Sequence, residues 1–165
     1  MPLAPAITDL DQLKERPPLA RLLAWNPGAV EAAKFDRDEL TIVVKRAAIR
    51  EACAILRDDR ELQFNFLADI TCVDWYPNEP RFEVIYHLLS IPEHQRLRLK
   101  VRLAGDDPNL ESVTSVWPSA DFFEREVYDL FGVRFAGHPN LRRIMMPEDW
   151  EGHPLRKDYP VEGYR

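Results

Sequence analysis

The chain has 165 residues, of which 45% are hydrophobic and 30% are charged, a composition typical of a soluble chain with apolar material for one core. Its formal net charge of −6 argues against nucleic acid or an anionic membrane surface as the main partner, because both require a basic footprint. No apolar run approaches the ~20 residues of a membrane-spanning helix, and the acidic start does not resemble a signal peptide. We therefore expect a cytoplasmic chain that binds no nucleic acid and meets a membrane only indirectly.

The first part of the chain predicts short helices and a hairpin. Residues 1–28 form a lead-in with weak helical signals that a proline-glycine pair ends. Two apolar runs, 30–35 and 40–44, flank a polar turn and predict a β-hairpin. Residues 47–57 follow as a helix, because their apolar side chains recur every three to four positions. We expect this helix to cover one face of a sheet.

Three further segments predict strands. Residues 66–75 and 82–90 are rich in β-branched and aromatic side chains, and a proline-containing loop joins them. Residues 96–103 alternate between apolar and basic side chains, so one face is expected in the core and the other in solvent or against an acidic partner. The basic face consists of Arg96, Arg98, Lys100 and Arg102. Connections this short favour antiparallel pairing.

These elements predict an α+β fold, with a mainly antiparallel sheet of about five strands, helices on one face, and an extended irregular C-terminal tail. We expect residues 1–28 to be the lead-in, residues 29–136 the core domain, and residues 137–165 a partner-binding tail. Residues 105–117 carry turn signals and predict no regular element.

The clearest helix of the second half begins after Ser119, a candidate capping residue, and ends at Gly132, where a left-handed residue is expected. Arg125 and Asp129 lie four positions apart and predict an ion pair on the helix surface. The apolar stripe of the helix consists of Phe123, Val127, Leu130 and Phe131. This stripe predicts the buried side of the helix.

The tail, residues 137–165, has prolines every six to eight residues, which exclude long helices. It is nevertheless rich in apolar and basic side chains, a combination that is enriched at the cores of protein interfaces. The residues that suggest an interface most directly are Arg142, Arg143, Trp150, Arg156, Lys157, Tyr159 and Tyr164. We favour a partner protein over a tail folded back onto its own domain.

Few side chains suggest chemistry within the chain itself. Glu124 and Glu126 could serve as general acid and base, but on a helix they point about 200° apart. His138 could complete such a site, although no metal-ligand spacing accompanies it. Cys72 is expected to be a buried structural thiol, and Cys53 lies too far away for a CxxC motif. A stand-alone acid–base enzyme built on Glu124, Glu126 and His138 therefore stays as an alternative, as does an acidic-protein dock on the basic strand face.

One spaced motif runs from the last helix into the tail: Glu124-Arg125-Glu126, Asp129-Leu130-Phe131, His138 and Arg142. This motif resembles the signature of the 30-kDa subunit family of respiratory complex I, the bacterial form of which is the proton-translocating NADH:quinone oxidoreductase. The continuation from Arg142 to Tyr164 resembles the C-terminal segment of the same family. The resemblance extends over about residues 40–165.

The resemblance implies a non-catalytic subunit of a translocating oxidoreductase, with a role in assembly and in electron transfer from NADH to quinone. It implies that the chain itself holds no cofactor, and that FMN and iron–sulfur clusters belong to partner subunits. The expected neighbours are the 49-kDa-type subunit and other subunits of the peripheral arm, on the cytoplasmic face of the bacterial inner membrane. Related subunits occur in membrane-bound hydrogenases and similar complexes, so the electron donor stays open.

The resemblance also implies which residues belong to the signature or to the partner interface. These are Glu124, Arg125, Glu126, Asp129, His138, Arg142 and Arg143, together with Trp150, Arg156, Asp158 and Tyr159 of the tail. None of them is expected to be catalytic, to bind a metal or to bind a cofactor.

Overall fold

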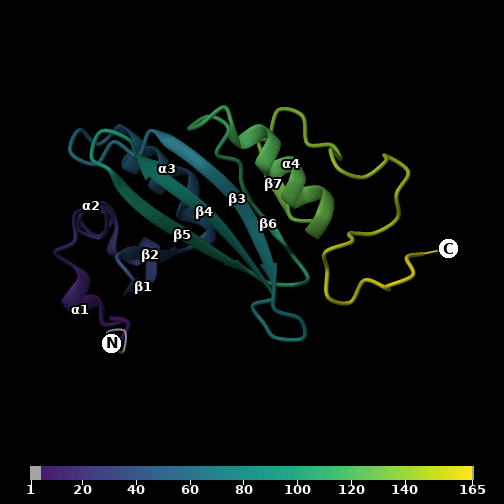
Figure 1. Ribbon diagram of the computed structural model, residues 1–165, viewed down its shortest axis with the longest axis horizontal. Coiled ribbons are helices and arrows are strands. Elements are labelled where there is room, and N and C mark those ends of the chain that lie inside the picture. The colour runs from purple at the N-terminus through teal and green to yellow at the C-terminus, as the bar shows by residue number, and fades with distance from the viewer. Residues whose placement is uncertain (1–4, 165) are drawn as a thin grey trace.

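The computed structural model describes residues 5–164. Its helices are α1 (Leu10–Leu13), α2 (Pro17–Trp25), α3 (Ile49–Asp58) and α4 (Ala120–Phe131), with single 3-10 turns at Pro27–Ala29 and Arg46–Ala48. Its strands are β1 (Val30–Asp36), β2 (Glu39–Val44), β3 (Phe66–Asp74), β4 (Phe82–Ser90), β5 (Gln95–Leu103), β6 (Asn109–Glu111) and β7 (Arg134–Ala136). The N-terminal elements and the C-terminal segment lie at opposite ends of the long axis (Figure 1).

The main sheet has five strands in the order β1-β2-β5-β4-β3. The pairs β1–β2, β3–β4 and β4–β5 are antiparallel, as the short loops predict, and the α+β class is confirmed. The pair β2–β5 is parallel, which the loop lengths did not indicate. The reason is that α3, β3 and β4 lie between these two strands in the chain, so the connection is long enough for a parallel crossover.

Strand β5 lies in the middle of the sheet, so its basic face is not at an edge. The predicted alternation is confirmed, because Leu97, Leu99, Val101 and Leu103 are all buried. On the other face, Arg98 pairs with Glu39. Lys100 Nζ lies 2.7 Å from Glu83 Oε1, and Arg102 Nε lies 3.8 Å from Glu83 Oε2. Most of the predicted basic face is therefore neutralised by carboxylates of neighbouring strands.

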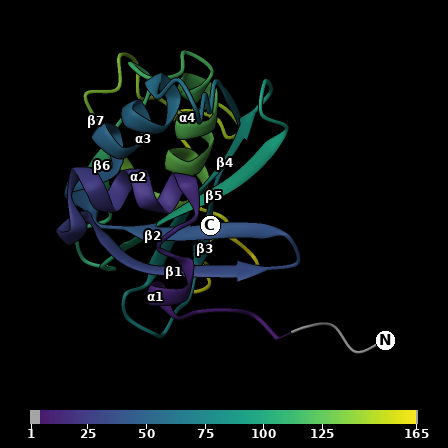
Figure 2. The same cartoon turned by 90° about the vertical axis from the view of Figure 1, so that its left-hand side faces the viewer.

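The longer helices α2, α3 and α4 lie together on one side of the sheet, as predicted (Figure 2). Helix α3 buries Cys53 and Leu56 against it, which confirms the period found in the sequence. Helix α2 contributes the fully buried Leu19 and Leu22 to the same core. Part of the N-terminal lead-in is thus packed against the domain that follows it.

A second sheet of two short strands, β6 and β7, ends directly before the C-terminal segment. Strand β6 pairs with β7 in parallel, although the sequence predicted no element at β6. Strand β6 has only three residues, too few to show a period of two. Between these strands, Ser119 stands at the start of α4 without making a capping hydrogen bond, whereas Gly132 adopts the predicted left-handed conformation with φ of 76°. The chain leaves β7 alongside α4, and residues 137–164 contain no helix or strand.

Replacing Leu99 by alanine is expected to lower the free energy of unfolding by about 2–5 kcal/mol, because its side chain is fully buried in the central strand and truncation leaves a cavity. Urea unfolding followed by circular dichroism measures this change. Arg102→Ala, on the solvent face of the same strand, is the control and should change the free energy by no more than about 0.5 kcal/mol. Equal effects of the two substitutions would contradict the assignment of faces.

Candidate functional site

Helix α4 carries two buried carboxylates, Glu124 and Asp129, which precede and follow the exposed Glu126 in the sequence. Glu124 and Asp129 have no exposed surface, so the predicted position of Asp129 on the helix surface is wrong. The predicted ion pair between Arg125 and Asp129 is also wrong. Arg125 instead lies 4.0 Å from the carboxylate of Asp121 and donates to the carbonyl groups of two tail residues. Asp129 is engaged elsewhere, because the tail reaches it from outside the helix.

The Asp129 carboxylate binds a turn of the C-terminal segment. Its Oδ1 accepts a hydrogen bond of 2.6 Å from Arg143 Nη1. Its Oδ2 accepts from the backbone N–H groups of Ile144, Met145 and Met146, at 2.9, 2.7 and 2.9 Å. Burial alone would raise the pKa of Asp129, but these hydrogen bonds outweigh it and lower the pKa. An ionised carboxylate therefore satisfies four donors of a segment that has no regular structure of its own.

The last turn of α4 is bound by the next part of the segment. His153 Nδ1 lies 2.9 Å from the carbonyl oxygen of Asp129, and Arg156 Nε donates to the carbonyl of Phe131 at 2.6 Å. These contacts satisfy helix-end carbonyls that would otherwise lack partners. They also give a second reason, besides the positive φ angle, why position 132 is a glycine. A Cβ there would lie 2.5 Å from Arg156 Nη2 and 2.6 Å from the His153 ring.

A second buried carboxylate binds the far end of the segment. Asp74, the last residue of β3, accepts a bidentate pair from Arg81 at 2.9 and 2.8 Å and a hydrogen bond from the N–H of Lys157 at 2.8 Å. Arg81 also binds both oxygens of Asp158, at 3.0 and 2.6 Å. Burial would raise the pKa of Asp74, but the bonds from Arg81, Lys157 and Tyr76 outweigh it and lower the pKa to about 2.

Neither Arg81 nor the role of Asp74 was predicted from the sequence. A signal for Asp74 was available, because the alternation of its strand places it on the same face as the buried Cys72, and an inward carboxylate needs partners. No local signal joins Arg81 to Asp158, since 77 positions separate them. The tail residues Arg143, Arg156 and Asp158, which the resemblance singled out, all take part in these contacts.

The opposite side of the segment exposes apolar side chains among charged ones such as Glu148, Asp149 and Glu151. Met145 is 62% exposed, Leu155 is 49% exposed, and Val161 is fully exposed. Trp150 and Tyr164 are exposed as well, and the Tyr164 ring packs edge-on against Tyr159 at 5.3 Å between centroids. The segment therefore has features of both predicted arrangements, a tail folded back onto its own domain and a tail that binds a partner. Several of its polar groups bind the domain, while several of its apolar side chains face outward.

The proposed acid–base trio does not form an accessible site. Glu124 Oε2 accepts from Ser112 Oγ at 2.6 Å, Oε1 accepts from the N–H of Val113 at 2.7 Å, and no part of the side chain reaches solvent. The His138 side chain is also buried, with Nε2 4.0 Å from Glu124 Oε2. Glu126 is exposed and turned away. Burial is the main cause that raises the pKa of Glu124, to about 7, with a smaller contribution from Asp121.

The two cysteines are buried and unpaired with each other, and burial raises the pKa of both thiols, which agrees with the predicted structural role of Cys72. Within residues 5–164, no group of three or more His, Cys, Asp or Glu side chains is arranged to hold a metal ion. In the same residues, no helix combines the length and the apolar character required to cross a membrane.

The family model described as "Respiratory-chain NADH dehydrogenase, 30 Kd subunit" matches residues 42–165. The chain belongs to this family. The match includes α4 and the whole C-terminal segment, so the family predicted from the spaced motif is confirmed. The chain is accordingly one subunit of an oxidoreductase complex of the NADH dehydrogenase type.

Curated relatives of the 30-kDa family support the assignment. The C subunit of the NADH-quinone oxidoreductase from Citrifermentans bemidjiense is 53% identical over 127 residues, which cover 77% of this chain and 78% of the relative. The protein of the same name from Roseiflexus sp. is 48% identical over 143 residues, which cover 87% of this chain and 82% of the relative.

Two solved structures share the fold. The trypsin-resistant fragment (1-134) of Nqo5 superimposes with a TM-score of 0.61 at 35% identity, covering 75% of this chain and 99% of the fragment. A chain of the membrane-bound sulfane sulfur reductase, an archaeal respiratory membrane complex, superimposes with a TM-score of 0.74 at 29% identity, covering 90% of this chain and 86% of that chain. The fold of this chain thus also occurs in an archaeal respiratory membrane complex named as a sulfane sulfur reductase.

Asp129→Asn is expected to lower the free energy of unfolding by about 2–4 kcal/mol, because the amide group would face donors and Arg143 would lose its ionised partner. The substitution should also release the segment, which hydrogen exchange of residues 143–157 would detect as loss of protection. Glu126→Gln, on the exposed side of the same helix, is the matched control and should change neither quantity. Retained protection in Asp129→Asn would show that the carboxylate is not the anchor.

Glu124 is expected to make stability depend on pH. Its pKa is raised in the folded state, so its contribution is fully present below the unfolded value of 4.5 and is lost as the pH rises through about 7. The free energy of unfolding should fall by about 2 kcal/mol between pH 5 and pH 8 from this group. Urea titrations of Glu124→Gln and the native chain across this range should differ by that slope, and parallel pH profiles would contradict the assignment.

Proposed function

We propose that this chain is a cofactor-free subunit of the peripheral arm of a proton-translocating NADH:quinone oxidoreductase. Its role is to support assembly, and thereby electron transfer from NADH to quinone, by docking the 49-kDa-type subunit with the outer side of residues 137–164. The observation that carries this proposal is the two-sided C-terminal segment, which is bound to the domain by buried carboxylates and exposes apolar side chains on its other side.

The exposed side chains suit a protein partner in number and type. Met145, Trp150, Leu155 and Tyr164 combine aromatic and flexible apolar groups, which are enriched at interface cores. A standard interface buries about 800 Å² on each partner, enough to cover most of these side chains. Left in water, an apolar surface of this kind favours association, so a covering subunit supplies the missing contact.

The anchors make the segment suitable as a docking surface. A disordered tail would lose conformational entropy on binding, and that loss would reduce the affinity. Here Asp129 and Asp74 already hold the backbone at two places, through the N–H groups of residues 144–146 and of Lys157. The segment can therefore meet its partner with much of that entropy already lost during folding of the subunit.

The same proposal places the redox groups in other subunits. Cys53 and Cys72 are buried on different elements with raised thiol pKa values, which does not suit iron–sulfur ligation by this chain. FMN and iron–sulfur clusters would then be held by neighbouring peripheral-arm subunits, and quinone and NADH would be reached only through the complex. In a bacterium, the arm would project from the cytoplasmic face of the inner membrane.

A second candidate is a subunit of a related respiratory membrane complex with another electron donor. The observation that favours it is the likeness to a chain of the archaeal sulfane sulfur reductase, which covers 90% of this chain. The exposed tail serves docking equally well in either complex. The donor activity that co-purifies with the chain distinguishes the two candidates.

Met145→Ser combined with Leu155→Ser is expected to weaken the association with the 49-kDa-type subunit at least about tenfold, because both side chains are exposed and neither makes an anchoring side-chain contact. Co-expression, purification in mild detergent and mass spectrometry of the retained subunits measure this loss. The isolated variant should keep its melting temperature.

The matched control is Phe66→Ser combined with Ile91→Ser, two side chains of similar exposure, 47% and 55%, near the paired ends of β3 and β4. This control should co-purify with the same subunits as the native chain. If the tail variant retained its neighbours as fully as the control does, docking through the C-terminal segment would be refuted.

A further inference from the structure

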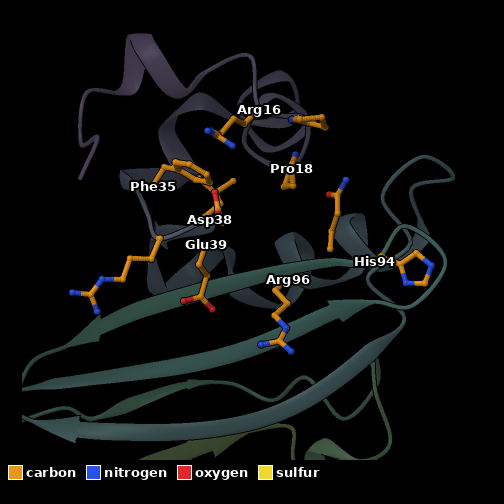
Figure 3. A pocket seen from close by; sticks show the side chains of 11 residues that line it. Arg16, Pro18, Phe35, Asp38, Glu39, His94 and Arg96 are labelled. Atoms are coloured by element: carbon orange, nitrogen blue, oxygen red, sulfur yellow. The ribbon is translucent and has the colours of Figure 1, made fainter. Parts of the chain in front are cut away.

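A hollow of about 570 Å³ lies away from the C-terminal segment, where three turns meet. It is formed by the start of α2, the turn between β1 and β2, and the turn between β4 and β5. Figure 3 shows Arg16 and Phe35 on one side of it, and Arg96 and His94 on another. Most of its lining residues precede position 42, where the family match begins, so the hollow is not a feature of the matched region.

Three arginines give the hollow a positive charge. Arg16, Arg37 and Arg96 all line it, and none of them has an ion pair among the residues that the structure describes. Of the two lining carboxylates, Glu39 is already paired with Arg98, which leaves Asp38. Three cationic groups against one such carboxylate leave a local excess of positive charge in a chain whose net charge is −6.

Two further features favour an anion there. Helix α2 begins at the hollow with Pro17 and Pro18, and it has neither a capping side chain nor an acidic residue in its first turn. The positive end of its dipole is therefore not compensated within the helix. The Arg16 guanidinium lies 3.3 Å from the centroid of the Phe35 ring, a stacking contact that restrains its orientation.

Arg96 is the one residue of the predicted basic face that no carboxylate of the sheet neutralises, and it lies at the hollow. Arg98, Lys100 and Arg102 find carboxylates on neighbouring strands, whereas Arg96 lines the hollow with the other two arginines. Two of the lining residues, Leu40 and Pro18, are apolar and buried. A lining that combines cationic and apolar side chains matches a peptide in which a carboxylate stands next to an apolar side chain.

We propose that this hollow is a second docking site, which binds an acidic peptide segment of a neighbouring subunit through Arg16, Arg37 and Arg96. The inference rests on the proposed function in one respect, that the chain works inside a larger complex. An acidic segment is favoured over a small free anion because the hollow is open and its charged groups come from three separate places, the start of α2, the turn between β1 and β2, and the start of β5. Such a shape suits a segment that passes across them, with its carboxylates meeting the guanidinium groups.

Photocrosslinking in the purified complex tests the proposal. Gln95, which lines the hollow, is replaced by p-benzoylphenylalanine, and crosslinked peptides are identified by mass spectrometry. We expect a crosslink to a segment of another subunit that contains Asp or Glu. In the same background, Arg16→Gln, Arg37→Gln and Arg96→Gln together should lower the crosslink yield at least about tenfold.

The control changes three basic residues outside the hollow, Lys45→Gln, Arg60→Gln and Arg134→Gln, which likewise have no ion pair among the described residues, and it alters the net charge equally. It should leave the crosslink yield unchanged, and both triple variants should keep the melting temperature of the native chain. A crosslink only to lipid, no crosslink at all, or a yield that the first triple variant does not lower would overturn the proposal. In each of these cases, co-purification of the chain with its complex shows that the proposed function still stands.

Discussion

The C-terminal segment depends on buried carboxylates, because it has no helix or strand to satisfy its own backbone groups. Asp129 accepts from three consecutive N–H groups and from Arg143, and Asp74 accepts from the N–H of Lys157 and from Arg81. A carboxylate without these donors would be costly to bury, and the donors without the carboxylates would be unpaired. Each side therefore requires the other, and the irregular backbone acquires a defined path along α4 and the end of β3.

Fixing the path of the backbone also fixes which side chains face outward. With the polar groups of the segment turned toward the domain, Met145, Leu155 and Val161 remain in contact with solvent. In the proposed role, this outward side of the segment would be the contact surface for a neighbouring subunit, and the domain would support it.

The two buried carboxylates of α4 differ in charge state although they lie on one helix. Asp129 receives charged and backbone donors, which lower its pKa, whereas Glu124 receives only a hydroxyl group and one N–H, so burial prevails and raises its pKa. Near neutral pH, Asp129 is ionised and Glu124 is close to its midpoint. Asp129 thus receives more donors, one of them a charged guanidinium group, whereas burial is the dominant effect on Glu124.

The sequence by itself determined the elements with a local period and the family. The alternation of β5, the apolar stripe of α4, the end of that helix at Gly132 and the spaced motif are all properties of neighbouring residues, so each could be identified without a fold. Only the tertiary structure decided that β2 and β5 pair in parallel, that Asp129 binds Arg143 and not Arg125, and that Arg81 joins Asp74 to Asp158. The physical reason is that a side-chain contact between distant positions leaves no period in the sequence, since the folded backbone alone brings the two partners within hydrogen-bond distance.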